Sequence, residues 1–190
     1  MTAVRVGFAM CGSFCTFSKA LEQMEELLRH GYEIIPIMSF NACTTDTRFG
    51  SAKEIREKVE LLCGRKIIGT IEAAEPLGPK KMTDILLVAP CTGNTAAKLA
   101  HAVTDTPVTM AVKSHLRQGK PVVLAIATND ALGASAQNIG RLMNSRHYYF
   151  VPFRQDDPLQ KPNSLVADFT LIPKTLALAW EGKQLQPVLC

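Results

Sequence analysis

Two uninterrupted apolar runs constrain the fold more than any other feature of this sequence. They read ILLVA at 85–89 and PVVLAIA at 121–127. Runs of this length without alternating polar residues are typical of strands that are buried on both faces, as in parallel sheets covered by helices. Segments with helical spacing of apolar residues lie between the predicted strands. The sequence therefore predicts a three-layer, doubly wound α/β fold with a mainly parallel sheet.

The other elements follow from the same patterns. Ser51 and Glu54 have the spacing of a capping box, and apolar residues then recur at helical intervals up to Gly64. Pro36 cannot donate a backbone hydrogen bond, so a strand over 32–38 is expected either at a sheet edge or bonded there only through its carbonyl. We predict further strands over residues 4–10, 67–71 and 148–152, and further helices over residues 17–30, 107–119, 134–144 and a C-terminal region around Trp180.

Length, composition and charge limit the classes of protein to which this chain can belong. The 190 residues, 47% of them hydrophobic, suffice for one sizeable core, so we expect a single domain over residues 1–190. No apolar run approaches the ~20 residues of a membrane-spanning helix, which favours a soluble cytoplasmic protein without a membrane partner. The 21 basic and 17 acidic residues are dispersed, so no nucleic-acid partner is predicted. Six scattered cysteines without a CxxC pair favour reduced thiols and no metal site.

Small polar residues follow four of the predicted strands. These loops read CGS at 11–13, SFN at 39–41, CTGNT at 91–95 and TND at 128–130. The carboxyl ends of parallel strands share one edge of a sheet, and free N–H groups of helix starts there suit a phosphate or carboxylate. Each loop alone is also explained as a tight turn, but four in register favour a ligand site. The candidate ligand-binding residues are Gly12, Ser13, Ser39, Cys91, Thr92, Gly93, Asn94, Thr95, Thr128 and Asn129.

The ligand is not predicted to be a dinucleotide bound in the common way. The first turn reads GFAMCGS and lacks the G-x-G-x-x-G spacing, and no Walker A sequence occurs. A mononucleotide such as FMN, or a small anion, suits the loops better. Ser13 could instead cap the first helix, and Asn94 could stabilise its own turn. We expect Cys91 to contact the ligand without acting as a nucleophile, and His101 and His115 to be surface or packing residues.

Three segments carry a resemblance to a known family. GFAMCGSFCTFSKA, DILLVAPCTGNTAAKLAHAVTDTPVTMA and PVVLAIATND are similar to the flavoprotein family that includes phosphopantothenoylcysteine decarboxylase and related cysteine decarboxylases. The resemblance implies a Rossmann-like flavoprotein fold over the whole chain. It also implies that FMN binds at the loops named above, or that a phosphate occupies the same pocket.

A closer resemblance rests on TNDALGASAQNIGRLMN and FVPFRQDDPLQKPNSLVADF. These stretches resemble a subgroup of the family that supplies one component of a two-component sporulation oxidoreductase. The resemblance implies NAD(P)-linked oxidation of dihydrodipicolinate to dipicolinate in the mother cell of a sporulating bacterium. It further implies a homo-oligomer and a partner, the A subunit, which holds NAD(P). Because the substrate has two carboxylates, we expect an arginine clamp, with Arg154 as the candidate and Lys161 nearby, at the same rim as the other loops. Their loop could equally be a partner-binding surface.

The chain departs from the decarboxylases of this family in two places. Those enzymes resemble one another in an active-site His near the middle of the chain and a Pro-Ala-Met-Asn-x-Met segment. Here no His lies between His30 and His101, and the corresponding segment at 127–132 reads ATNDAL. An independent FMN-dependent decarboxylase is therefore the weaker interpretation. Two roles remain open, that of a catalytic component and that of a non-catalytic partner with a vestigial mononucleotide pocket, which stabilises or regulates the A subunit.

Overall fold

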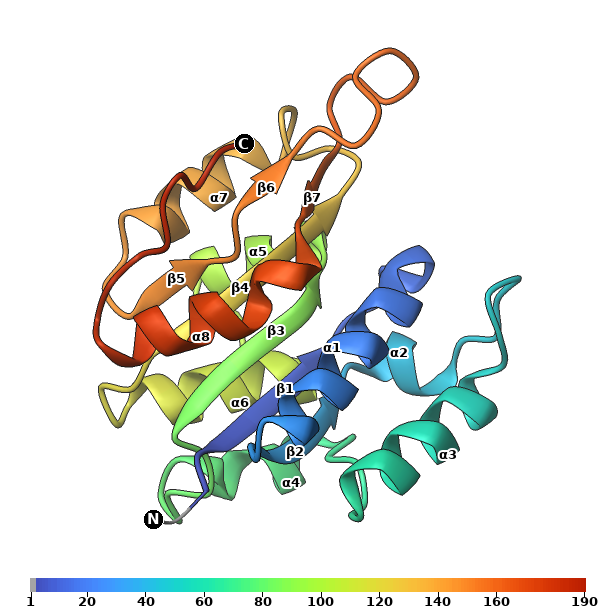
Figure 1. Ribbon diagram of the computed structural model, residues 1–190, viewed down its shortest axis with the longest axis vertical. Helices are drawn as coiled ribbons and strands as arrows, with labels where there is room; N and C mark the ends of the chain where they lie inside the picture. Colours follow the sequence, from blue (N-terminus) through green and yellow to red (C-terminus); the bar gives the residue numbers. More distant parts are fainter. Residues whose placement is uncertain (1–2) are drawn as a thin grey trace.

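A single seven-stranded sheet organises the protein, whose computed structural model describes residues 3–190 (Figure 1). Five strands run parallel in the order β2-β1-β3-β4-β5. Beyond them, the end of β4 pairs antiparallel with β7, and β7 pairs antiparallel with β6. The strands are β1 (Arg5–Met10), β2 (Glu33–Met38), β3 (Ile85–Cys91), β4 (Val122–Thr128), β5 (Tyr148–Phe150), β6 (Phe153–Arg154) and β7 (Leu165–Ala167). The predicted α/β class and mainly parallel sheet are confirmed.

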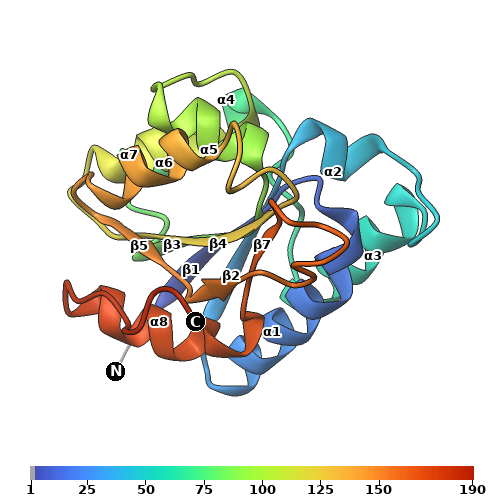
Figure 2. The same cartoon turned by 90° about the horizontal axis from the view of Figure 1, so that it is seen from above.

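Helices cover both faces of this sheet (Figure 2). One face carries α1 (Phe17–Arg29) and α8 (Ile172–Trp180). The other face carries α4 (Ile71–Ala74), α5 (Gly93–Ala100), α6 (Pro107–Leu116) and α7 (Ala136–Met143). The helices α2 (Phe40–Thr44) and α3 (Ala52–Cys63) lie beside edge strand β2. The short 3-10 helices of the described residues are η1 (Phe14–Thr16), η2 (Glu75–Leu77) and η3 (Phe169–Leu171). Within residues 3–190, no helix combines the length and apolar character needed to cross a membrane.

Local sequence signals placed several of these elements correctly. Ser51 and Glu54 form the predicted capping box at the start of α3, and Gly64 ends that helix with a left-handed φ of 62°. Pro36 lies in the edge strand β2, where its carbonyl accepts a hydrogen bond from the Ile68 N–H at 2.9 Å. Edge position removes the need for the backbone donor that proline lacks.

The predicted strand over residues 67–71 is wrong. Ile68 forms only an isolated bridge with Ile37, and α4 begins at Ile71. The side chain of Thr70 caps this helix by accepting the Ala73 N–H at 3.2 Å. Thr70 therefore acts as a helix N-cap rather than as a β-branched strand residue. Trp180, the last residue of α8, is 56% exposed and so lies outside the core of this chain.

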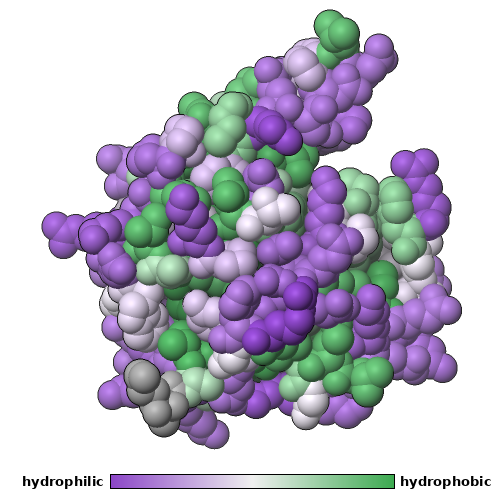
Figure 3. Space-filling model, viewed as in Figure 1, coloured by the Kyte–Doolittle hydropathy of each residue, from purple (hydrophilic) through white to green (hydrophobic). Residues whose placement is uncertain are grey.

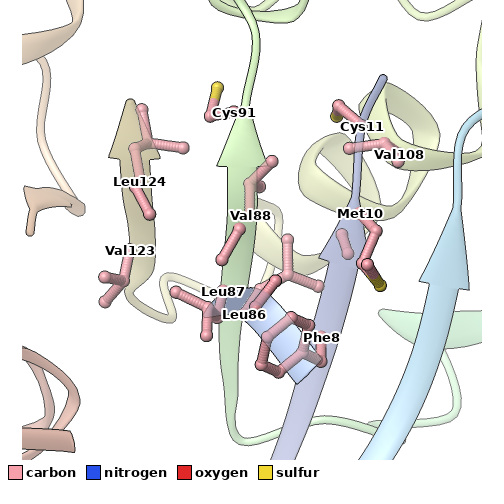
Figure 4. Close-up of a cluster of buried hydrophobic side chains, with 14 of the residues drawn as sticks. Phe8, Met10, Cys11, Leu86, Leu87, Val88, Cys91, Val108, Val123 and Leu124 are labelled. Carbon is pink, nitrogen blue, oxygen red and sulfur yellow. The ribbon is translucent and has the colours of Figure 1, made fainter. Parts of the chain in front are cut away.

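The core lies between the central strands and the two helical layers. Figure 4 shows Phe8 and Met10 of β1 beside Leu86, Leu87 and Val88 of β3, with β4 on the other side. Each of these five side chains is fully buried, and burial of one such side chain stabilises the fold by about 1.5–3 kcal/mol. Every residue of β3 is buried, so this strand is covered on both faces, as the apolar run at 85–89 predicted.

An ion-pair network of three side chains lies at the amino end of the sheet. The Arg5 guanidinium donates two hydrogen bonds to the Asp84 carboxylate, from Nε at 2.9 Å and from Nη2 at 2.8 Å. Lys120 Nζ lies 3.4 Å from the same carboxylate. These hydrogen bonds, with that of Arg5 the largest influence, lower the pKa of Asp84 to about 2. The charges at this end are therefore paired within the protein.

A buried histidine lies in the same region. His115 is 1% exposed, and its Nδ1 and Nε2 lie 2.9 Å from Thr83 Oγ1 and 3.0 Å from the Pro121 carbonyl oxygen. Because a carbonyl only accepts, Nε2 carries the proton and Nδ1 accepts from the Thr83 hydroxyl. Burial lowers the pKa of His115 to about 4. His115 is thus a neutral packing residue, in agreement with the expectation from the sequence.

Candidate functional site

Three of the four predicted strand-end loops meet around a cavity of about 550 Å³ at the carboxyl edge of the sheet. We call it the rim cavity. Figure 3 shows a notch between the projecting segment 155–164 and the body of the molecule, on the side where these loops meet. The predicted residues in the cavity wall are Gly12, Ser13, Thr92, Thr128 and Asn129. The fourth loop lies beside it, since Asn41 Cβ is 3.6 Å from the point where a Gly12 Cβ would stand.

The loop after β1 presents an uncommitted hydroxyl to the rim cavity. Its backbone is held by the Cys11 N–H, which donates to the Pro90 carbonyl at 3.2 Å, and by the Ser13 N–H, which donates to the Cys11 carbonyl at 2.8 Å. The Ser13 side chain makes no cap hydrogen bond, and its Oγ has only a long contact of 4.0 Å to Cys15 Sγ. The capping alternative for Ser13 is therefore wrong, and the residue lines the rim cavity.

In the loop after β3, the threonine hydroxyls form hydrogen bonds within the protein. Thr92 accepts the Thr95 N–H at 3.2 Å and donates to Thr95 Oγ1 at 3.1 Å, and the Thr95 hydroxyl donates to Cys11 Sγ at 3.2 Å. This series of hydrogen bonds caps α5 and ties β1 to β3. Thr92 therefore contributes surface to the rim cavity while its hydroxyl serves the fold.

The loop after β4 is organised around a carboxylate. Asp130 Oδ1 accepts hydrogen bonds from Thr128 Oγ1 at 2.5 Å and from Ser135 Oγ at 2.9 Å. This group packs against Gly93, the first residue of α5. A Cβ at Gly93 would lie 2.5 Å from Ser135 Oγ and 2.8 Å from Asp130 Oδ1. The glycine is required here for close packing between two loops of the protein itself.

Half of the predicted ligand-binding residues lie outside the cavity wall. Ser39 caps α2 by accepting the Ala42 N–H at 3.3 Å. Cys91 is buried, and burial raises the pKa of its thiol well above the usual value, so it is no nucleophile. Asn94 is exposed in the first turn of α5, between Gly93 and Thr95. These residues shape the strand ends without lining the cavity.

Two cationic side chains line the rim cavity, of which Lys161 was expected at this rim and Arg48 was not predicted from the sequence. Arg48 comes from the segment between α2 and α3, and its guanidinium lies 4.8 Å from the centroid of the Phe49 ring. Lys161 comes from the segment between β6 and β7 and pairs with Asp156 at 3.1 Å. Arg48 belongs to no motif quoted from the sequence, whereas Lys161 lies in the stretch FVPFRQDDPLQKPNSLVADF. The folding of two distant loops brings both side chains to the strand ends. Arg48, which has no ion-pair partner among the described residues, provides positive charge beside the Ser13 hydroxyl, whereas the charge of Lys161 is paired with Asp156 of the same wall.

Arg154 does not lie at the rim cavity, contrary to our expectation. It lies in β6, and the pairing of Arg154 with Val166 of β7 places it in a second cleft of about 510 Å³. This second cleft, which we call the α1 cleft, lies between α1 and the segment from β6 to η3. The two sites adjoin, since Asp156 and Val166 contribute to both walls.

Comparison with a protein-family model decides the family. The model described as Flavoprotein matches residues 1–168. The chain belongs to the flavoprotein family. Similar solved structures include an FMN-dependent cysteine decarboxylase, SpaF, which is 25% identical to this chain, with a TM-score of 0.66 over 93% of this chain and 97% of that one.

Two relatives have much higher identity. The B subunit of dipicolinate synthase from Bacillus subtilis (strain 168) is 49% identical over 185 residues, which cover 97% of this chain and 92% of that protein. The crystal structure of the B subunit of dipicolinate synthase from Bacillus halodurans is 45% identical and superposes with a TM-score of 0.90 over 100% of this chain and 98% of that one. The closer resemblance that we drew from the sequence is confirmed.

The rim cavity contains groups that suit a phosphate and groups that suit a ring, beside one carboxylate, that of Asp156. The Ser13 hydroxyl, Arg48 and Lys161 offer donors and positive charge to a phosphate. Phe14 and Val166 offer apolar surface to a ring. The residues present therefore fit FMN, and they equally fit another small anion with a flat apolar part.

Proposed function

We propose that this chain is one component of a two-component, NAD(P)-dependent dipicolinate synthase. With the A subunit, it would contribute to the oxidation of dihydrodipicolinate to dipicolinate in the cytoplasm of a sporulating cell. The observation that carries the proposal is the 49% identity over 97% of the chain to the B subunit of dipicolinate synthase. The name of that relative itself implies a second, different polypeptide. We further propose that the chain assembles with copies of itself and with the A subunit.

The division of labour follows from the chemistry. Aromatisation of the dihydropyridine ring transfers a hydride to NAD(P) and releases a proton, so it requires a nicotinamide site and an oriented substrate. The first turn of this chain lacks the dinucleotide spacing, so we assign NAD(P) to the A subunit. The rim cavity would bind and orient an anion through Ser13, Arg48 and Lys161. FMN, when bound there, would supply a ring that accepts and returns two electrons.

A second function is favoured by one specific observation. The hydroxyls of Thr92, Thr95 and Thr128 are committed to hydrogen bonds within the protein. A pocket whose donors serve the fold is what a non-catalytic partner that stabilises the A subunit would retain. Independent decarboxylation has less support, because the histidines of the central part of the chain, His101 and His115, both lie outside the rim cavity wall.

Turnover of the reconstituted complex separates these functions. The experiment mixes the A subunit with wild-type chain, with Arg48→Met and with Ser13→Ala, and follows NAD(P)H formation from dihydrodipicolinate. A catalytic role predicts a loss of about tenfold for Arg48→Met, as expected when one charged contact to a bound anion is removed. Arg56→Met, at an exposed position on α3, is the matched control.

The assembled state must be measured in the same samples. Sedimentation of each mixture shows whether the complex forms. Assembled complexes with unimpaired turnover in both rim-cavity variants would contradict the catalytic role. A rise in the melting temperature of the A subunit, shared equally by all variants, would instead establish the stabilising role.

A further inference from the structure

The last residues of the chain, 184–190, lie beside β5 and β6, and we call them the C-terminal strap. In Figure 1 the strap leaves the end of α8, passes β5 and reaches the C-terminus near β6. β5 pairs with β4 and β6 pairs with β7, so each short strand has one edge that no strand of the described sheet covers. Buried backbone N–H and C=O groups at such an edge need other partners.

The side chain of Gln184 takes the place of a strand beside β5. Its Oε1 atom accepts the Phe150 N–H at 2.7 Å, and its Nε2 atom donates to the Phe150 carbonyl at 2.7 Å. Nε2 also donates to the Leu185 carbonyl at 2.9 Å. Phe150 is 2% exposed. Gln184 therefore satisfies both backbone groups of a buried residue, and its loss would leave them without these partners.

The last three residues extend the sheet beyond β6. The Phe153 N–H donates to the Val188 carbonyl at 3.1 Å, and the Cys190 N–H donates to the Phe153 carbonyl at 3.2 Å. These bonds form a parallel bridge between Phe153 and Leu189. The strap thus bonds to both strands, and the rings of Phe150 and Phe153 lie 6.1 Å apart between their centroids beneath it.

The end of α8 fixes the start of the strap. Gly182 has a left-handed φ of 74°, which glycine adopts without strain. Its N–H donates to the Ala179 carbonyl at 3.0 Å, and the Lys183 N–H donates to the Leu178 carbonyl at 2.9 Å. This pair of bonds is a Schellman motif. The strap is therefore held at both ends, by α8 and by β6.

The strapped strands lead directly into one wall of the rim cavity. The segment after β6 contributes Asp156, Lys161 and Ser164 to this wall. β6 has only two residues and pairs with β7 at two positions, and a two-stranded pairing is marginally stable by itself. The position of the wall therefore depends on what holds β6 from its other edge. The strap lies outside residues 1–168, which the family model matches.

We propose that the C-terminal strap positions this wall of the rim cavity, with Gln184 as the positioning residue. The strap touches no ligand. It holds β5 and β6 against the sheet, so that Asp156, Lys161 and Ser164 keep their places in the cavity wall. Loss of its hydrogen bonds opens the β6–β7 hairpin while the central strands stay folded. The effect on ligand binding rests on the proposed function, whereas the position of the wall does not.

Trypsin reports the opening of the hairpin without any ligand. A protease cuts a strand only when it opens, so cleavage of the Arg154–Gln155 bond measures the open population of β6. The other basic residue of the hairpin, Lys161, precedes Pro162 and is therefore a poor site for trypsin. Cleavage after Arg117, at the end of α6, serves as the internal reference. Mass spectrometry of the fragments separates the two cuts.

Variants of the strap should change one cut and not the other. Gln184→Met keeps the length of the side chain and removes its donors and acceptor, so cleavage after Arg154 should be about tenfold faster. Cys190→Pro removes the N–H that bonds to Phe153 and should also speed this cut. Cys190→Ala keeps that N–H and is the matched control. Unchanged cleavage after Arg154, or equal acceleration after Arg117, would overturn the proposal.

Titration with FMN tests whether the held wall matters for the cavity. Gln184→Met should bind FMN about three- to tenfold more weakly than the wild type, as expected when contacts of a binding site are loosened. Asp84→Asn, at the other end of the sheet, should lose stability without losing affinity. Wild-type affinity in a Gln184→Met chain that is cut faster after Arg154 would overturn the positioning role. If the wild type does not bind FMN, the anion site is contradicted, and the trypsin rates still decide the strap.

Discussion

The two ends of the sheet use polar groups in opposite ways. At the amino end, Arg5 and Lys120 both pair with Asp84, and His115 is buried with both ring nitrogens bonded. At the carboxyl end, the Ser13 hydroxyl has only a long sulfur contact, and Arg48 has no acidic partner among the residues that the structure describes. Paired groups stabilise the fold, whereas groups without partners at a concave surface are available to a ligand.

Within the carboxyl end, too, some polar groups are paired inside the protein and others are not. The Thr92–Thr95 and Thr128–Asp130–Ser135 clusters resemble ligand-binding loops in sequence, yet their hydrogen bonds close within the protein. Small polar residues at a strand end therefore do not identify a ligand contact by themselves. Whether a hydroxyl is free decides the question. Variants at the amino end should accordingly alter stability, and variants in the rim cavity should alter binding.

The largest expected effect concerns His115 and pH. Its folded pKa of about 4 lies below the ordinary value of 6.5, so the folded state binds fewer protons than the unfolded state between these values. Stability is then complete above pH 6.5 and falls as the pH is lowered to 4, by about 3 kcal/mol in total from this group. Urea unfolding at pH 7.5, 5.5 and 4.5 measures the change. A His115→Phe variant should be less stable at pH 7.5 and should lose this part of the pH dependence; an unchanged pH dependence would show that other groups cause it.

The next effect is at Gly93, where the two clusters of the carboxyl end pack together. Gly93→Ala places a Cβ 2.5 Å from Ser135 Oγ, so we expect a loss of about 1–3 kcal/mol in the free energy of unfolding. Gly140→Ala is the control, because a Cβ there meets nothing within 4 Å on α7 and should be neutral or stabilising. Equal behaviour of the two variants in urea unfolding would contradict the close packing.

A smaller loss of stability is expected for Asp84→Asn. This change removes the charge that Arg5 and Lys120 share, and we expect a loss of about 1–2 kcal/mol at pH 7, discounted for the partial exposure of the pair. Because the folded pKa of Asp84 is lowered to about 2, its contribution is complete above pH 3.8 and is lost as the pH falls toward 2. Acid unfolding followed by circular dichroism should show this transition in the wild type and a weakened one in the variant.

The smallest expected change in stability is that of Ser13→Ala. Because its hydroxyl lacks a strong partner in the protein, the free energy of unfolding should change by less than about 0.5 kcal/mol. The affinity for an anion in the rim cavity should nevertheless fall. Thermal unfolding with and without FMN measures both quantities in one experiment. A variant that is clearly destabilised without ligand would assign Ser13 to the fold.

The architecture could be predicted from the sequence because the patterns that determine helices and strands are local. The apolar runs of β3 and β4, the capping box at Ser51 and the stop at Gly64 each act within one element. The short segment at 67–71 was predicted wrongly because two local signals compete there. Its β-branched residues favour a strand, but the Thr70 cap decides the local conformation.

The site could be predicted only in part, because tertiary packing determines which polar groups remain free. The strand-end loops gave the correct edge of the sheet and five residues of the cavity wall. Arg48 reaches it from a segment without a motif, whereas Lys161 was expected at this rim. Arg154 was assigned to the wrong cleft because its pairing with Val166 of β7 cannot be predicted from the local pattern. The bonds of Asp130 to Thr128 and Ser135 likewise exist only in the folded chain.

Titration of the purified chain with FMN, followed by quenching of the flavin fluorescence, tests the account most directly. We predict saturable binding to the wild type and to Asp84→Asn with the same affinity, and binding weakened by about tenfold or more in a Ser13→Ala, Arg48→Met double variant. Absence of saturable binding to the wild type, or equal affinity for the double variant, would contradict the claim that the free polar groups of the carboxyl end form an anion-binding site.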